Sequence, residues 1–164
     1  MAGTGFQVSY DGVLEALGAL EKNVKDPGAA LDAVANSIAE DSRQNFDEQS
    51  DPWGNSWKKL APATKRARRG DGGDVQILQD DGHLLSSIEG HATSDGEALV
   101  GAGSGPSAVY AAIHQFGGKT GRNHAATIPA RPYLPVTKDG VDLPASQEKT
   151  LMDVIQQHLE PADG

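Results

Sequence analysis

The feature that most restricts the fold of this 164-residue chain is the segment 128–137, which contains three prolines. A proline fixes its own backbone and cannot donate a ladder hydrogen bond, so the segment cannot lie inside a sheet. We expect at most an edge strand, or an extended strap over residues 128–137. Arg131 stands between Pro129 and Pro132, with Tyr133 directly after. The two prolines allow the strap to display both side chains at a low entropic cost.

Arg131 has two interpretations. Its planar guanidinium suits a carboxylate or a row of backbone carbonyls. It could form an internal salt bridge that ties the strap to the helices. Alternatively, Arg131 and Tyr133 contact a neighbouring subunit and fix one copy against the next.

A short helix precedes the strap. Pro106 opens it, Tyr110 lies within it, and Gly117 and Gly118 end it, since glycine tolerates a left-handed backbone. His114 lies in the last turn, where the helix dipole favours a partly charged imidazole that bonds the terminal carbonyls. We interpret His114 as a structural cap and not as a ligand.

The remaining elements follow from apolar periodicity and turn residues. They are a strand at 6–10, a helix over 11–20, a long helix opened by Pro27 with Leu31, Val34, Ala35, Ile38 and Phe46 on one face, a short helix at 62–68, a helical turn at 84–88, a hairpin of 88–93 with 98–102, a polar loop at 119–126 and a final helix from about 143 to 159. The fold class is α+β: a small, mostly antiparallel sheet packed by a long helix in the N-terminal half, a central short helix and a C-terminal helix. We expect one domain over residues 1–164, with a flexible basic and glycine-rich excursion at about 50–76.

The net charge of −9 hides a concentration of positive charge in one short window without acids. We call these residues the basic segment: Lys58, Lys59, Lys65, Arg66, Arg68 and Arg69. A solvated surface helix is one interpretation. The density of like charge favours a negative partner, either DNA phosphate or the acidic surface of an adjacent copy. No base-reading pattern accompanies it, so any DNA contact would be to phosphates.

Both tryptophans, Trp53 and Trp57, lie in the loop 51–60. Their rings either cover the edge of the core or act as interface anchors, since tryptophan is enriched at binding hot spots. Both interpretations place the loop near an edge of the domain.

Catalytic, metal-binding and membrane functions lack a signature. The chain has no cysteine, and its five histidines show no close ligand spacing. The glycine-rich stretch 101–105 lacks the Gly-Lys-Ser/Thr of a phosphate-binding loop and reads as a flexible connection. No serine has a paired base, and no 18 apolar residues occur in succession. We therefore expect no catalytic residue, no cofactor, no metal and no membrane partner.

The order and spacing of several of these pieces resemble the phage virion morphogenesis and tail-completion proteins. The similar pieces run from about residue 51 to 137: the tryptophan loop, 77–88, 100–101, 110–118 and 128–134. Their order is more specific than any single piece.

The resemblance implies a non-enzymatic structural virion protein of the neck or the head-proximal tail end, assembled in the host cytoplasm and located at the head–tail junction. Its partners would be copies of itself in a ring around the DNA channel, a hexamer or alternatively a dodecamer, and neighbouring neck, connector or tail proteins. Non-specific contact with packaged DNA is compatible with the same placement. The alternative is a nucleic-acid-binding accessory protein that uses residues 58–69, with an affinity that falls steeply with salt.

Overall fold

The computed structural model describes residues 27–68 and 75–159. The strand and helix expected within 6–20, Arg69 and the glycine-rich turn at 70–74 lie outside these residues. The described elements are α2 (Gly28–Glu48), α3 (Pro62–Arg68), α4 (His83–Ser86), β1 (Glu89–Ala92), β2 (Ala98–Gly101), the 3₁₀ turn η2 (Gly105–Ser107), α5 (Ala111–Phe116), β3 (Gly118–Thr120), the 3₁₀ turn η3 (Arg122–His124), β4 (Ala126–Ile128), β5 (Val136–Thr137), β6 (Gly140–Val141) and α6 (Ala145–Leu159).

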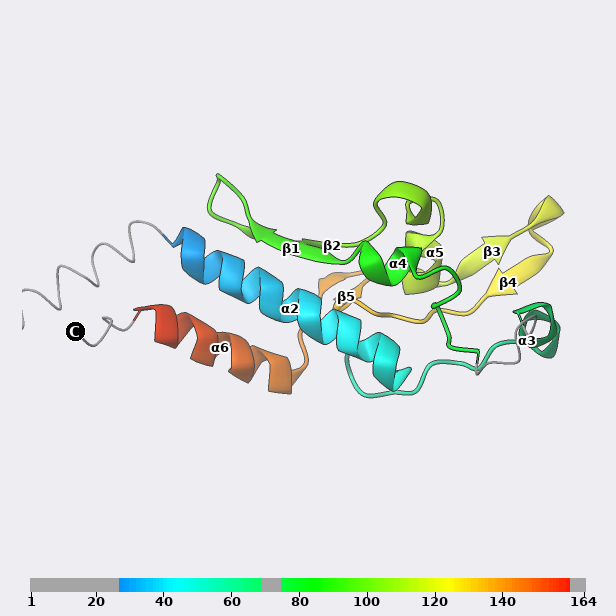
Figure 1. Ribbon diagram of the computed structural model, residues 1–164, viewed down its shortest axis with the longest axis horizontal. Coiled ribbons are helices and arrows are strands. Elements are labelled where there is room, and N and C mark those ends of the chain that lie inside the picture. The colour runs from blue at the N-terminus through cyan, green and yellow to red at the C-terminus, as the bar shows by residue number, and fades with distance from the viewer. Residues whose placement is uncertain (1–26, 69–74, 160–164) are drawn as a thin grey trace, which may run out of the picture.

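The long helix α2 is the centre of the arrangement, with the β1–β2 hairpin along one side and α6 along the other (Figure 1). The α+β class is confirmed, and all strand pairs in the described residues are antiparallel. These strands form three separate two-stranded sheets where we expected one small sheet. Two strands bury too little surface to be stable alone, so the β1–β2 hairpin depends on α2 beside it.

The buried face of α2 differs in part from the predicted one. Its fully buried residues are Ala35, Ala39, Ser42 and Phe46, at helical spacing. Leu31, Val34 and Ile38 are half-buried at the margins of this face. Small side chains therefore occupy the centre of the contact, which lets another backbone approach closely. The helix begins at Gly28, one residue after the predicted start, so Pro27 is the N-cap and not the first helical residue.

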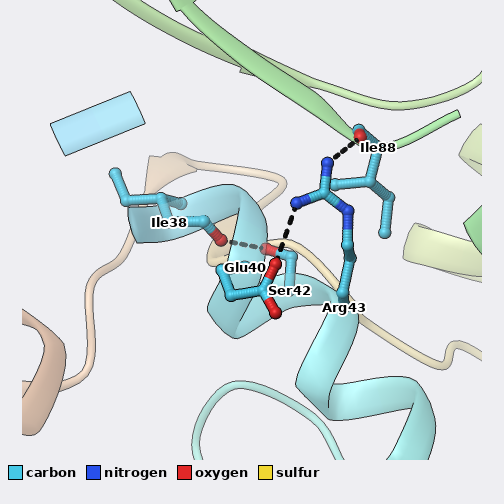
Figure 2. Close-up of polar contacts among 5 residues, drawn as sticks. All are labelled: Ile38, Glu40, Ser42, Arg43 and Ile88. Atoms are coloured by element: carbon cyan, nitrogen blue, oxygen red, sulfur yellow. Dashed lines mark hydrogen bonds and ion pairs between the residues drawn. The ribbon is translucent and has the colours of Figure 1, made fainter. Parts of the chain in front are cut away.

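The backbone that lies close to this face of α2 is that of strand β1. A Cβ atom at Gly90 would lie 2.3 Å from the carbonyl oxygen of Ala35, so only glycine fits there. Arg43 Nη2 donates to the carbonyl of Ile88 at 2.5 Å, and Arg43 Nη1 pairs with Glu40 at 3.1 Å (Figure 2). At the other end of the strand, the amide of Ala92 donates to the carboxylate of Asp32. Both ends of β1 are thus tied to α2.

The β1–β2 hairpin confirms the prediction to within a residue or two. Its register pairs Glu89 with Gly101 and Ala92 with Ala98. The turn closes with a hydrogen bond of 2.7 Å from the Thr93 amide to the Glu97 carbonyl. The helical turn at 84–88, the short helix at 62–68 and the final helix are likewise present as α4, α3 and α6.

The region from 105 to 128 departs from the predictions. The helix that we expected from Pro106 starts as the 3₁₀ turn η2, and α5 begins only at Ala111. The predicted polar loop at 119–126 contains the hairpin β3–β4, in which Gly118 faces Ile128. Its residues 121–127 are exposed, so it has no alternation of apolar residues from which a strand could be predicted.

The strap itself is extended and unpaired over residues 129–135, as its prolines predict. It passes between β4 and β5 and packs into the main hydrophobic core. That core joins α2, the tryptophan loop, α4, α5 and the strap, and its residues are Ala39, Phe46, Trp57, Ile77, Leu78, Leu84, Ile88, Ala111 and Tyr133. On the opposite side of α2, α6 buries Leu151.

Candidate functional site

The strap and the tryptophan loop form one hydrogen-bonded unit. The indole Nε1 of Trp57 donates to the carbonyl of Pro132 at 2.8 Å. In return, Arg131 Nε donates to the carbonyl of Lys58 at 2.8 Å, and its Nη2 lies 3.4 Å from the carbonyl of Lys59. Each segment therefore supplies a side chain that binds the backbone of the other.

Arg131 is only 5% exposed, and its side-chain partners are backbone carbonyls. The expected internal salt bridge is wrong in its chemistry: in the described residues no carboxylate pairs with this guanidinium. Burial, and secondly the positive charge of Arg68, lower the pKa of Arg131 from its ordinary value. A guanidinium can be held in this way because its planar fork matches neighbouring carbonyls and stays protonated despite the shift.

Tyr133 is 2% exposed. Its hydroxyl donates to the carbonyl of Ala111 at 3.2 Å, and its ring lies 5.6 Å from the ring of Phe46. Burial raises the pKa of Tyr133 to about 12. The strap therefore turns Arg131 and Tyr133 inward in the single chain, where we expected it to display them.

Sequence reasoning missed Gln115, which organises the strap from α5. Its Oε1 accepts the amides of Tyr133 and Leu134 at 3.0 and 3.1 Å. Its Nε2 donates at 2.8 Å to the carbonyls of Leu134 and Val136. An extended strap has no ladder partner, and Gln115 satisfies the backbone groups that a neighbouring strand would otherwise bind. A polar residue directly before Phe116 in the last turn of α5 was the available signal.

His114 does not behave as the predicted cap. Burial lowers its pKa below 6.5, and the charges of Arg131 and then Arg68 lower it further. The imidazole is therefore neutral at pH 7, its ring packs edge-on against Tyr110, and its Nδ1 has no hydrogen-bond partner. The role is still structural, because the backbone carbonyl of His114 accepts the amide of Arg131 at 2.7 Å.

Helix α3, which carries the middle of the basic segment, lies at one end of the molecule, away from α6 (Figure 1). Lys58, Lys59 and Arg66 are exposed, whereas Lys65 and Arg68 are half-buried. Arg68 pairs with Asp80 at 3.4 Å. The other four have no ion-pair partner among the described residues. Their charges are thus open to a partner outside the single chain.

The two tryptophans differ in environment. Trp57 is 5% exposed and packs edge-on against Phe46 at a ring distance of 5.3 Å. Trp53 is half-buried, and its Nε1 has no hydrogen-bond partner. Trp57 is a core residue in this chain, while Trp53 lies closer to the surface.

In the glycine-rich stretch 101–105, Gly103 packs closely against α5. A Cβ atom at Gly103 would lie 2.6 Å from the Cβ of Ala111, and the Gly103 amide donates to Ser87 Oγ at 2.9 Å. Ser107 Oγ also donates to Ser87 Oγ, at 3.0 Å. These groups are already used within the fold, so the stretch offers no cradle for a phosphate.

The described residues contain no group of three or more His, Asp or Glu side chains that could hold a metal ion. None of their helices is long and apolar enough to cross a membrane.

Comparison with known proteins gives a consistent picture. The model of the phage virion morphogenesis family matches residues 8–160. The Mu-like prophage FluMu G protein 2 of Haemophilus influenzae is 37% identical over 112 residues, which cover 68% of each chain. Protein G of Escherichia phage Mu, whose name assigns it provisionally to capsid assembly, is 32% identical over 133 residues, covering 79% of this chain and 77% of its own. No solved structure matched this chain.

Proposed function

The chain belongs to the phage virion morphogenesis family, and we propose that it is a non-enzymatic structural protein that acts where the phage head meets the tail. The observation that carries this proposal is the family match over residues 8–160, which spans nearly the whole chain. The phage Mu relative is named for capsid assembly. A protein of the neck would contact the capsid on one side and the tail on the other, so this placement accommodates that name.

We further propose that copies of the chain form a ring around the DNA channel, with a hexamer as the first expectation. A ring needs a heterologous interface, in which one surface patch meets a different patch on the next copy. The basic segment supports such an interface, because four of its charges have no ion-pair partner among the described residues and α3 lies at one end of the molecule, where it can supply one of the two patches. The net charge of −9 suits a channel lining that lets DNA slide without binding it.

Deletion of the gene from the phage that encodes this chain tests the placement. If the protein joins head and tail, electron microscopy should show filled heads and separate tails in the lysate. The wild-type gene supplied from a plasmid should restore joined particles. Absent or misshapen heads would instead assign the protein to capsid assembly, and normal particles would contradict both roles.

Native mass spectrometry of the purified protein, alone and with head or tail partners, tests the ring. A closed oligomer of defined size is expected, and monomer under every condition would count against it. The nucleic-acid-binding alternative predicts DNA affinity that falls steeply with salt and is lost when Lys58, Lys59 and Arg66 become Ala. No DNA binding at low salt would remove that alternative.

A further inference from the structure

A polar cavity of about 270 Å³ lies between α2 and α6, at the end of α2 that leads into the tryptophan loop. Three prolines and a set of polar side chains line it; the polar residues are Asp41, Ser42, Gln44, Asn45, Glu48, Ser146, Gln147 and Thr150. Apolar side chains would be expected between two packed helices, so this composition needs an explanation.

Three amide side chains around the cavity already donate to groups of the same chain. Gln44 Nε2 donates to Glu48 Oε1 at 2.6 Å, and Asn45 Nδ2 donates to the carbonyl of Tyr133 at 3.1 Å. Gln147 Nε2 donates to Asp41 Oδ2 at 2.8 Å. The carboxylates keep acceptor capacity, because each carboxylate oxygen can accept more than one hydrogen bond.

One acceptor is fully orphaned. Gln147 is 7% exposed, and its Oε1 is buried without a hydrogen-bond partner. A buried polar atom without a partner costs free energy, so native structures pair such atoms with protein, water or a ligand. This atom belongs to the side chain that bonds Asp41, and it lacks the same kind of partner as the carboxylates, a hydrogen-bond donor.

The carboxylates also lack a counter-charge. Neither Asp41 nor Glu48 forms an ion pair with a described residue. A cavity that offers two carboxylates and an unpaired amide oxygen suits an ammonium or a guanidinium group.

The chain carries a guanidinium and an ammonium group on α3, outside the lining of its own cavity. Arg66 on α3 is exposed and has no ion-pair partner among the described residues, and Lys65 beside it also lacks one. Helix α3 lies apart from α6 (Figure 1), and none of its residues lines the cavity. A second copy is therefore the natural source of the donor, since a head-to-tail arrangement brings α3 of one copy to the cavity of the next.

We propose that the cavity between α2 and α6 receives Arg66, supported by Lys65, from α3 of a neighbouring copy. This inference rests on the proposed self-assembly and names its interface. Charge complementarity sets the partner, and the contact is heterologous because α3 of one copy meets the α2–α6 cavity of the next, as a ring requires.

Cross-linking tests the contact directly, because the chain has no cysteine and engineered thiols are the only ones present. One protein carries Ala67→Cys on α3, next to Arg66, and the other carries Thr150→Cys at the cavity. Mixed under mild oxidation, they should form a disulfide heterodimer that is visible on a non-reducing gel. Ala67→Cys mixed with Ala112→Cys, an exposed position on α5, controls for random collision.

Neutral substitutions then test the chemistry. Asp41→Asn with Glu48→Gln keeps size and most hydrogen bonding, and it should weaken self-association by about tenfold or more, as should Arg66→Glu. The matched control is Asp47→Asn, which removes an exposed charge beside Glu48 that does not line the cavity. It should leave association within about twofold of wild type. Sedimentation velocity measures the association, and circular dichroism checks that each variant is folded.

The outcomes separate the two proposals. An oligomer that forms but ignores these substitutions, with no cross-link above the Ala112→Cys control, overturns the cavity contact and leaves the ring intact. Protein that stays monomeric at every concentration and with every partner overturns both. A cross-link that the neutral substitutions do not reduce would overturn the assigned chemistry.

Discussion

At the scale of single residues, the molecule stabilises its strap with side chains that bind backbone. Trp57 donates to a carbonyl of the strap, and Arg131 donates to a carbonyl of the tryptophan loop. Gln115 binds the strap backbone groups that a neighbouring strand would otherwise bind. A buried backbone group without a partner is costly, so an extended segment rich in proline survives in a core only if side chains satisfy it.

Trp57→Phe should lower the free energy of unfolding by about 1–3 kcal/mol, because it removes the bond to the Pro132 carbonyl and part of the buried ring. Urea denaturation measures the change. Trp53→Phe is the matched control, since the Trp53 Nε1 makes no hydrogen bond, and it should cost clearly less. Equal losses for the two variants would contradict the role given to the Trp57 bond.

His114 should make the protein sensitive to mild acid. Its pKa is lowered in the folded chain, mainly by burial, so below 6.5 the unfolded state binds the proton more readily. The stabilising contribution is present above pH 6.5 and is lost as the pH falls through the lowered folded pKa. Between pH 7.5 and about pH 5, wild type should lose more stability than His114→Gln. Denaturant midpoints across this range measure the difference, and parallel curves would refute it.

At the scale of elements, the contact between α2 and β1 decides the position of the hairpin. Alanine and serine at the centre of the buried face of α2, and Gly90 on β1, bring two backbones together. The bonds from Arg43 to Ile88 and from Ala92 to Asp32 then fix both ends of the strand (Figure 2).

Gly90→Ala should separate these two elements. The added methyl group would lie 2.3 Å from the Ala35 carbonyl oxygen, and helix backbone cannot yield as a side chain can. We expect a loss of at least about 2 kcal/mol in the free energy of unfolding. Gly101→Ala on the paired strand β2 has no atom within 4 Å of the new Cβ and should be nearly neutral. Thermal and urea denaturation compare the two, and a neutral Gly90→Ala would show that β1 is not held so closely.

At the scale of the whole molecule, packing is uneven. Helix α2 is covered on two sides, by the β1–β2 hairpin and by α6, whereas the β3–β4 hairpin extends from the body and has an exposed tip (Figure 1). Segments with few buried contacts open at a lower free energy than the core does.

The rates of amide hydrogen exchange should follow this difference in packing. Amides of β3 and β4 should exchange much faster than those in the middle of α2 and in β1, although both hairpins are antiparallel ladders. Mass spectrometry of peptides from the isolated protein measures the rates. Protection of residues 118–128 that appears only after assembly would show that a partner covers the hairpin, and equal protection in the isolated protein would contradict the expected difference.

The sequence by itself determined the elements whose signals are local. The spacing of apolar residues predicted α2 and α6, turn residues predicted the β1–β2 hairpin, and proline predicted both α3 and the extended strap. The exposed hairpin β3–β4 lacks such spacing and was missed. The exposure of Lys58, Lys59 and Arg66 was also predictable, because charged side chains mostly stay at the surface, whereas Lys65 and Arg68 are half-buried.

Only the tertiary structure decided which way the strap faces and what its residues bind. Arg131 and Tyr133 turn inward because Lys58, Ala111 and Gln115 present partners from distant parts of the chain. The neutral His114 and the acceptor-rich cavity between α2 and α6 have the same origin. Burial and hydrogen bonding between residues far apart in sequence set these properties, and no local pattern encodes such distances.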